Sequence, residues 1–123
     1  MYKYNKYGNI KRIYKNIKFD SIKELARYKE LELLLKANKI KELEVHKTFL
    51  LLDKQAQTLI NCKEPAIKFT PDFYYFDNEL NVYIAEDVKP FNKKKGKFIL
   101  TTDYKLRKKF FKFKYNHIKF LEV

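Results

Sequence analysis

The strongest constraint on the fold is a pair of strand-like segments joined by a short turn. Residues 67–76 and 82–89 are rich in aromatic and β-branched side chains, which favour strands. Between them lies Asp77-Asn78-Glu79, a cluster of residues that favour turns. Together these patterns predict an antiparallel β-hairpin.

The expected hairpin register brings two carboxylates together. With a four-residue loop at residues 78–81, position i pairs with position 159 − i, and Asp72 falls opposite Asp87. Directly opposed side chains lie roughly 4.5–5.5 Å apart, and Lys89 lies on the same face as Asp87, roughly 7 Å along the strand. Two charges this close repel by about 4 kcal/mol at the effective dielectric of a protein surface. A divalent cation would relieve that repulsion.

These residue types suit phosphodiester hydrolysis. Carboxylate oxygens favour Mg²⁺ or Mn²⁺, and such an ion polarises a phosphoryl oxygen and lowers the pKa of bound water. Lys89 could orient the water and neutralise developing charge. Two simpler interpretations stay open: Pro71-Asp72 is a turn, and Asp87 with Lys89 is an exposed ion pair worth little. Glu86 should face away from Asp87, and only a bulge would make it a reserve ligand.

Helices are predicted on either side of the hairpin. Ser21 and Glu24 form a capping-box pattern that begins a helix extending to about Ala37. A second helix is predicted from a Thr101 or Thr102 cap to about Lys114. The expected apolar stripes are Ile22, Leu25, Tyr28, Leu31, Leu34 and Leu35 on the first helix, and Leu106, Phe110 and Phe113 on the second.

The remaining segments complete an α/β fold. Residues 43–52 alternate as one strand, residues 118–123 form a last strand, and residues 53–66 and 90–100 are loops. The predicted order is αβββαβ, a mixed β-sheet flanked by helices. The 123 residues suit one domain, read as a basic N-terminal arm or hairpin at residues 1–19 and a single domain at residues 20–123.

Basic residues are unevenly distributed along the chain. The net charge is +13, with +6 in residues 1–19, −3 in residues 20–88 and +10 in residues 89–123. Because 25 of the 28 basic residues are lysine, as AT-rich coding alone would give, their placement is more informative than their total. A basic C-terminal third favours nucleic acid as partner. The residues expected to contact DNA phosphates are Lys93, Lys94, Lys95, Lys97, Lys105, Arg107, Lys108, Lys109 and Lys112.

Several classes of protein are disfavoured. No run of residues is long and apolar enough for a membrane span or a signal peptide, so we expect no membrane partner and a cytoplasmic location. The single cysteine, Cys62, cannot form an intramolecular disulfide. His46 and His117 have no zinc-ligand spacing with it, so each histidine is interpreted as structural or exposed.

Two motifs of the chain together resemble the signature of the PD-(D/E)XK nuclease superfamily, whose core is also αβββαβ. They are Pro71-Asp72 and, at the end of the next strand, Asp87-Val88-Lys89. A larger set of features resembles a family of small phage nuclease-like proteins. It consists of these motifs, Phe19-Asp20-Ser21 to Glu24, Glu86 and the Lys-rich final helix. Those proteins are akin to phage endonucleases that resolve Holliday junctions. The likeness covers roughly residues 5–123, and Pro90 departs from the Gly that many relatives have after the lysine.

The resemblance implies that Asp72 and Asp87 ligate Mg²⁺ or Mn²⁺ and that Lys89 acts on the water and the phosphate. It implies that Glu24 serves a second metal or positions water, although Glu24 could be only a helix cap. The implied activity is that of a Mg²⁺-dependent endodeoxyribonuclease on branched or structured DNA. A candidate phage Holliday junction resolvase would act as a homodimer, in the host cytoplasm if phage-encoded. The alternative is a non-catalytic nucleic-acid-binding module.

Overall fold

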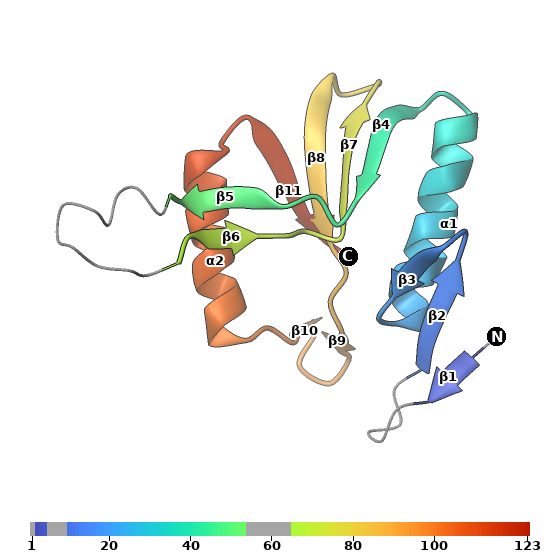
Figure 1. Ribbon diagram of the computed structural model, residues 1–123, viewed down its shortest axis with the longest axis horizontal. Coiled ribbons are helices and arrows are strands. Elements are labelled where there is room, and N and C mark those ends of the chain that lie inside the picture. The colour runs from blue at the N-terminus through green and yellow to red at the C-terminus, as the bar shows by residue number, and fades with distance from the viewer. Residues whose placement is uncertain (1, 5–9, 54–64) are drawn as a thin grey trace, which may run out of the picture.

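The computed structural model describes residues 2–4, 10–53 and 65–123, and a mixed four-stranded sheet lies at its centre (Figure 1). Its strand order is β11-β8-β7-β4, and β11 alone runs parallel to its neighbour. With the two helices, the strands of this sheet follow the predicted order αβββαβ. In chain order these elements are α1 (Ile22–Lys36), β4 (Ile40–Val45), β7 (Phe73–Asp77), β8 (Val82–Asp87), α2 (Thr102–Lys114) and β11 (Ile118–Glu122).

The β7–β8 hairpin has the predicted register. Phe73 pairs with Glu86 at one end, and Asp77 pairs with Val82 beside the turn. The Asp77 Oδ1 atom accepts two backbone N–H groups of the turn, each at 2.9 Å. This turn fixes the pairing of every residue along the two strands.

Two segments predicted as single strands are divided between sheets. Residues 43–52 form the end of β4 and then β5 (Phe49–Leu52), while residues 67–76 form β6 (Ile67–Phe69) and then β7. β5 and β6 pair with each other in a separate antiparallel sheet. The first break begins at His46, whose φ is 57°, and the second contains Pro71, which has no N–H for a ladder. The prediction of continuous strands was therefore wrong in both places.

Two further segments contain short strands: the N-terminal segment, predicted as an arm or hairpin, and the segment predicted as a loop at residues 90–100. The N-terminal segment includes three antiparallel strands, β1 (Tyr2–Tyr4), β2 (Ile10–Tyr14) and β3 (Ile17–Phe19). The predicted loop at residues 90–100 contains a short hairpin of β9 (Phe91–Asn92) and β10 (Lys97–Phe98). Most of the predicted loop at residues 53–66, with Cys62, lies outside the described residues.

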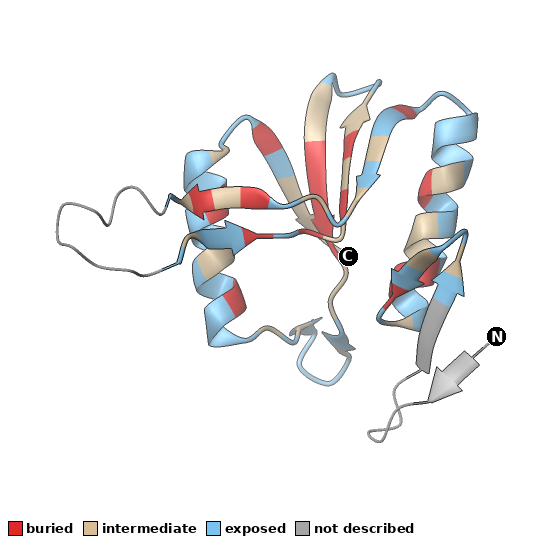
Figure 2. Cartoon of the chain, viewed as in Figure 1, coloured by how far each residue is buried: buried red, intermediate tan, exposed pale blue. Residues whose placement is uncertain are grey.

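The two helices cover opposite faces of the central sheet. Ile84 and Ala85, adjacent in β8, belong to different cores, as the alternation of a pleated strand requires. Buried positions gather on the central strands and on the helix sides that face them (Figure 2). The core beside α1 contains Phe19, Leu25, Leu31, Ile40, Phe73, Tyr75 and Ile84, and the core beside α2 contains Phe49, Leu51, Phe69, Ala85, Tyr104, Phe111 and Ile118.

The apolar stripe predicted for α2 was wrong. Its three members are exposed, and the ring of Phe113 is 83% exposed. The buried side chains of α2 are Tyr104 and Phe111, which occupy another face of the helix because β5 and β6 add a second surface for it to contact. In α1, Leu25 and Leu31 are buried as predicted, whereas Ile22, Leu34 and Leu35 are exposed. No helix among the described residues has the length and apolar character needed to cross a bilayer.

Two alanine variants of α2 test its orientation. Phe111→Ala should lower the free energy of unfolding by about 3–5 kcal/mol, because the ring is fully buried against Phe49 and Phe69. Phe113→Ala should change it by less than about 0.5 kcal/mol. Urea denaturation compares the two variants, and equal losses would contradict this packing.

Candidate functional site

Two aspartates meet at the end of the β7–β8 hairpin that lies away from its turn. Asp72 immediately precedes β7, and Asp87 is the last residue of β8. The N–H of Asp72 donates to Asp87 Oδ1 at 3.0 Å, and the N–H of Val88 donates to Asp72 Oδ2 at 2.7 Å. The structure thus brings these two residues together, as the hairpin register predicts.

Burial disfavours the form of this carboxylate pair in which both groups are ionised. The side chain of Asp87 is 5% exposed. Burial, and then the charge of Asp72, raises the pKa of Asp87 to about 7. Burial also raises the pKa of Asp72, against the opposing effects of the Val88 N–H and the Lys89 charge. A cation bound between the two carboxylates would favour their ionised forms.

Lys89 adds a positive charge beside the pair. Its Nζ lies 4.0 Å from Asp87 Oδ2 and 3.9 Å from the centre of the Tyr104 ring. The Tyr104 hydroxyl donates to Glu122 Oε2 at 2.7 Å, so this ring is fixed between α2 and β11. After Lys89, the carbonyl of Pro90 accepts the N–H of Ile99 at 2.8 Å, which closes the base of the β9–β10 hairpin. Sequence reasoning gave Tyr104 no part in the site.

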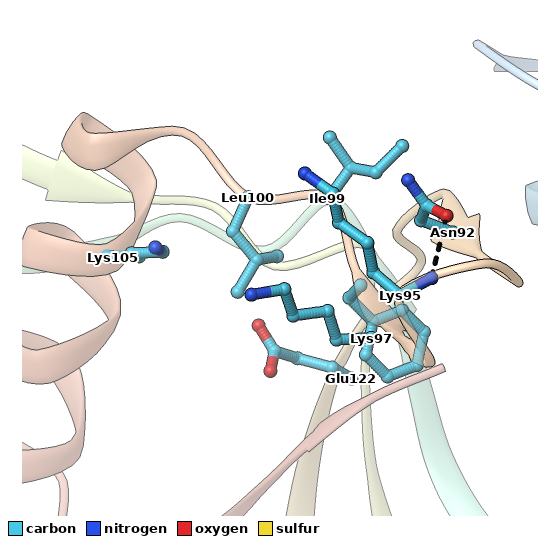
Figure 3. A pocket seen from close by; sticks show the side chains of 8 residues that line it. Asn92, Lys95, Lys97, Ile99, Leu100, Lys105 and Glu122 are labelled. Carbon is cyan, nitrogen blue, oxygen red and sulfur yellow. Dashed lines mark hydrogen bonds between the residues drawn. The ribbon is translucent and has the colours of Figure 1, made fainter.

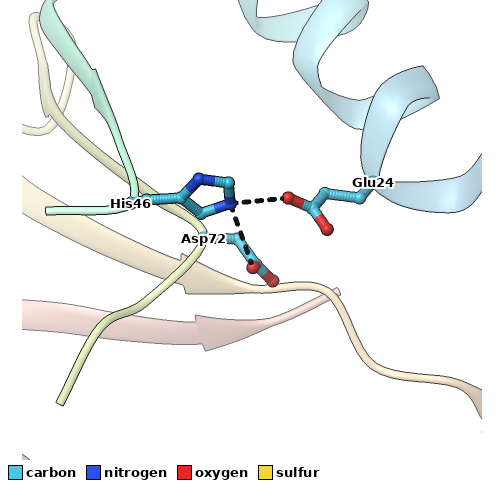
Figure 4. Close-up of side chains that lie close together, drawn as sticks. All are labelled: Glu24, His46 and Asp72. Atoms are coloured by element: carbon cyan, nitrogen blue, oxygen red, sulfur yellow. Dashed lines mark hydrogen bonds and ion pairs between the residues drawn. The ribbon is translucent and has the colours of Figure 1, made fainter. Parts of the chain in front are cut away.

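Glu24 reaches the site from α1. Its N–H donates to Ser21 Oγ at 3.1 Å, which confirms the predicted cap. Its carboxylate extends toward His46 and Asp72 (Figure 4), and Oε1 lies 2.9 Å from His46 Nε2. Burial, and then the charge of Asp72, raises the pKa of Glu24. Glu24 therefore helps to begin the helix and also belongs to the acidic site, the group formed by Asp72, Asp87 and Glu24.

His46 completes this group, and the interpretation of His46 as merely structural or exposed overlooked that position. His46 Nε2 lies 4.0 Å from Asp72 Oδ1, and one donor atom from each of Glu24, His46 and Asp72 lies within 4.8 Å of the other two. The N–H of His46 also donates to the carbonyl of Asp72 at 3.0 Å. The sequence alone carried no signal for this position, which follows from the pairing of β4 with β7: Val45 pairs with Phe73, so the next pair is His46 and Asp72.

Glu86 lies outside the acidic site. It faces away from Asp87, as predicted, and its side chain is fully buried. Arg27 donates to both of its carboxylate oxygens, at 2.8 and 2.6 Å, and the hydroxyl of Tyr75 donates to it as well. The regular pairing of β8 leaves no bulge that would turn Glu86 toward the site. This bidentate pair instead ties α1 to β8.

The predicted DNA-contacting residues fall into three groups. Lys95, Lys97 and Lys105 line a cavity of about 500 Å³ between the β9–β10 hairpin and α2, with Glu122 on another wall (Figure 3). Glu122 pairs with Asp87 in the sheet, so the cavity borders the acidic site. Other basic residues have partners: Lys108 bonds to Glu122, and Arg107 bonds to Asp103 and the Lys68 carbonyl. The remaining members, Lys93, Lys94, Lys109 and Lys112, are exposed and do not line this cavity.

The donor set fits a hard divalent cation. Asp72, Asp87 and Glu24 supply carboxylate oxygens, the ligands that Mg²⁺ and Mn²⁺ prefer. The two aspartates carry raised pKa values that a bound cation would lower. The exposure of Asp72 and His46, 20% and 39%, leaves access for water and a phosphate group. The chemistry of these groups suits a cation with an ammonium group beside it.

The chain belongs to the family described as "Protein of unknown function (DUF1064)", whose model matches residues 4–123. No curated protein and no solved structure matches the chain. The matched region contains both helices, all four strands of the central sheet and every residue of the acidic site.

The raised pKa of Asp87 predicts a pH dependence of stability in the metal-free protein. Its folded pKa of about 7 exceeds the ordinary value of 3.8, so the folded state binds more protons than the unfolded state between these values. The free energy of unfolding should therefore fall as the pH rises from about 4 to about 7. Asp87→Asn cannot ionise, so its advantage over wild type should grow across this window, to roughly 2–4 kcal/mol above pH 7.

Denaturant unfolding in EDTA at several pH values measures this difference. Asp103→Asn is the matched control, because Asp103 is 75% exposed on α2, and it should follow the wild-type curve. If the curves of Asp87→Asn and wild type ran parallel from pH 4 to 8, the electrostatic description of the pair would be wrong.

Proposed function

We propose that this member of the DUF1064 family is a metal-dependent endonuclease that hydrolyses phosphodiester bonds in DNA. The observation that carries the proposal is a buried carboxylate, Asp87, next to the partly buried carboxylate of Asp72, with an ammonium group beside them. The backbone N–H of Asp72 donates to Asp87 Oδ1 at 3.0 Å, and Lys89 Nζ lies 4.0 Å from Asp87 Oδ2. Carboxylates and a lysine in this arrangement are the parts that phosphodiester hydrolysis needs.

Asp72 and Asp87 would hold Mg²⁺ or Mn²⁺, with Glu24 as the additional acidic residue. The bound ion would offset charge on the phosphate and activate water. Lys89 would bond the attacking water and a phosphate oxygen; its ammonium lies 4.0 Å from Asp87 Oδ2 and 3.9 Å from the centre of the Tyr104 ring, which supports this role. The Tyr104 ring restricts the positions open to the Lys89 ammonium group. The ion pair between Arg27 and Glu86 holds α1 against β8.

The basic cavity supports DNA as the substrate. This cavity borders the acidic site and is lined by Lys95, Lys97 and Lys105. A DNA backbone that crosses the site would therefore place neighbouring phosphates near these ammonium groups. Contacts of this kind give affinity without sequence preference and make binding sensitive to salt. The exposed lysines elsewhere on α2 and on the β9–β10 hairpin extend the same positive surface.

The αβββαβ order, together with Asp72 and the Asp87-Val88-Lys89 sequence, supports membership of the PD-(D/E)XK superfamily. The resemblance to phage Holliday-junction-resolving endonucleases supports branched or structured DNA as the substrate. A resolvase of this kind makes two symmetric cuts, so we expect a two-fold homodimer on a four-way junction.

A non-catalytic nucleic-acid-binding module is the second candidate. It is favoured by the backbone N–H groups of Asp72 and Val88, which already donate to the acidic pair and would satisfy it in a purely structural role. The two candidates differ in metal-dependent cleavage.

Cleavage of a labelled four-way junction and of a linear duplex in Mg²⁺ separates them. Wild type should cut, and Asp87→Asn and Lys89→Ala should each slow cutting by at least about 100-fold, because each removes charge that acts on the transition state. Both variants should still bind DNA in a gel-shift assay, since the basic cavity is unchanged. The matched controls are Asp103→Asn and Lys119→Ala, which alter exposed residues that are not part of the acidic site and should cut like wild type. Binding by every variant with no Mg²⁺-dependent cut by wild type would establish the module instead.

The basic cavity makes a separate prediction about affinity. Replacing both Lys97 and Lys105 by Ala should weaken DNA binding and reduce the slope of log affinity against log salt by roughly 2, one for each lost phosphate contact. The control is the double replacement of Lys36 and Lys39, two exposed lysines near the opposite end of the central sheet. Fluorescence anisotropy from about 50 to 200 mM salt measures both slopes. Equal slopes for the two double variants would place the DNA elsewhere.

A further inference from the structure

His46 occupies an unusual position for a histidine with only a structural role. It follows the last residue of β4, has a φ of 57°, and its backbone N–H is fixed to the carbonyl of Asp72. The imidazole is 39% exposed, while the Glu24 carboxylate that it contacts is only 5% exposed. One edge of the ring therefore faces a buried carboxylate, and part of the ring remains open to solvent.

The donor atoms around His46 have the spacing of ligands on one cation. Neighbouring donors on an octahedral ion at about 2.1 Å lie about 3.0 Å apart, and opposite donors lie about 4.2 Å apart. The Nε2 atom of His46 lies 2.9 Å from Glu24 Oε1 and 4.0 Å from Asp72 Oδ1. The three side chains point toward one another (Figure 4). All three donors lie within 4.8 Å of one another, and the group does not include Asp87.

Among the described residues, the only hydrogen-bond partner of the Glu24 carboxylate besides His46 is a backbone N–H. Its Oε2 accepts a long backbone hydrogen bond of 3.4 Å from Asp20, and the ion-pair partners of the nearby Arg27 are Glu30 and Glu86. A buried carboxylate beside another acidic group is costly unless a cation or a proton accompanies it. His46 in its neutral form is also a good ligand for a transition metal.

We propose that His46, with Glu24 and Asp72, forms a second cation site, distinct from the Asp72–Asp87 pair, that prefers a transition-metal ion such as Mn²⁺ to Mg²⁺. Mg²⁺ favours oxygen ligands and water, whereas an imidazole nitrogen favours transition metals. The inference deepens the proposed function, because it names the ion that the second part of the same site takes. It concerns ion binding by the free protein, so its test needs neither DNA nor cleavage.

Pulsed electron paramagnetic resonance of Mn²⁺ added to the metal-free protein tests this site directly. A coordinated imidazole couples its nitrogen nucleus to the Mn²⁺ spin, so wild type should show a ¹⁴N modulation. His46→Ala should abolish the modulation and weaken Mn²⁺ binding at least tenfold in a competition with Mg²⁺. His117→Ala is the matched control, because His117 is exposed near the start of β11, and it should keep the wild-type signal.

His46→Gln distinguishes a lost ligand from a lost fold. Its amide can still donate a hydrogen bond to Glu24, and thermal unfolding confirms that the variant is folded. It should also lack the ¹⁴N modulation and lose the preference for Mn²⁺ over Mg²⁺. A wild-type modulation that persists in folded His46→Gln, or no modulation in wild type, would overturn the inference.

The outcomes for this inference and for the proposed function are separable. Cleavage in Mg²⁺ that needs Asp87 and Lys89, together with wild-type Mn²⁺ binding by His46→Ala, would overturn this inference alone. A ¹⁴N modulation that depends on His46, together with no cleavage of any DNA, would overturn the endonuclease function alone.

Discussion

Backbone hydrogen bonds between β7 and β8 hold Phe73 opposite Glu86, and the next pair along the two strands is Asp72 and Asp87. A slip of one residue would turn Asp87 to the other face of the sheet and bring Glu86 into the site. The turn at Asp77 prevents that slip by fixing where the hairpin begins. The chemistry of the candidate site therefore depends on this register more than on any single ionic contact.

The site is assembled from both layers of the molecule. α1 supplies Glu24 from one face of the sheet, and the bond between Arg27 and Glu86 fixes that helix against β8 three residues further along. α2 supplies the Tyr104 ring from the other face, and this ring contacts the ammonium of Lys89. Burial by both layers raises the pKa of the acidic groups, and that unfavourable state is what a cation would relieve.

The features that follow from local pattern were predictable, and those that follow from tertiary packing were not. Turn chemistry and alternation determine the β7–β8 register, so the meeting of Asp72 with Asp87 could be predicted. The break after His46 could not be recognised, because residues on both sides of it alternate as one strand would, and the site histidine was missed with it. Phe113 was assigned to the core because its spacing is helical, but the surface added by β5 and β6 buries Phe111 instead.

Anomalous diffraction from crystals soaked in Mn²⁺ tests the central claim most directly, since it locates bound ions independently of any assay. The account predicts a peak within about 2.0–2.6 Å of carboxylate oxygens from both Asp72 and Asp87. Lys89 should remain beside Asp87 when the ion is bound. Peaks confined to exposed carboxylates, with none at the end of the β7–β8 hairpin, would contradict the claim that this pair is a cation site.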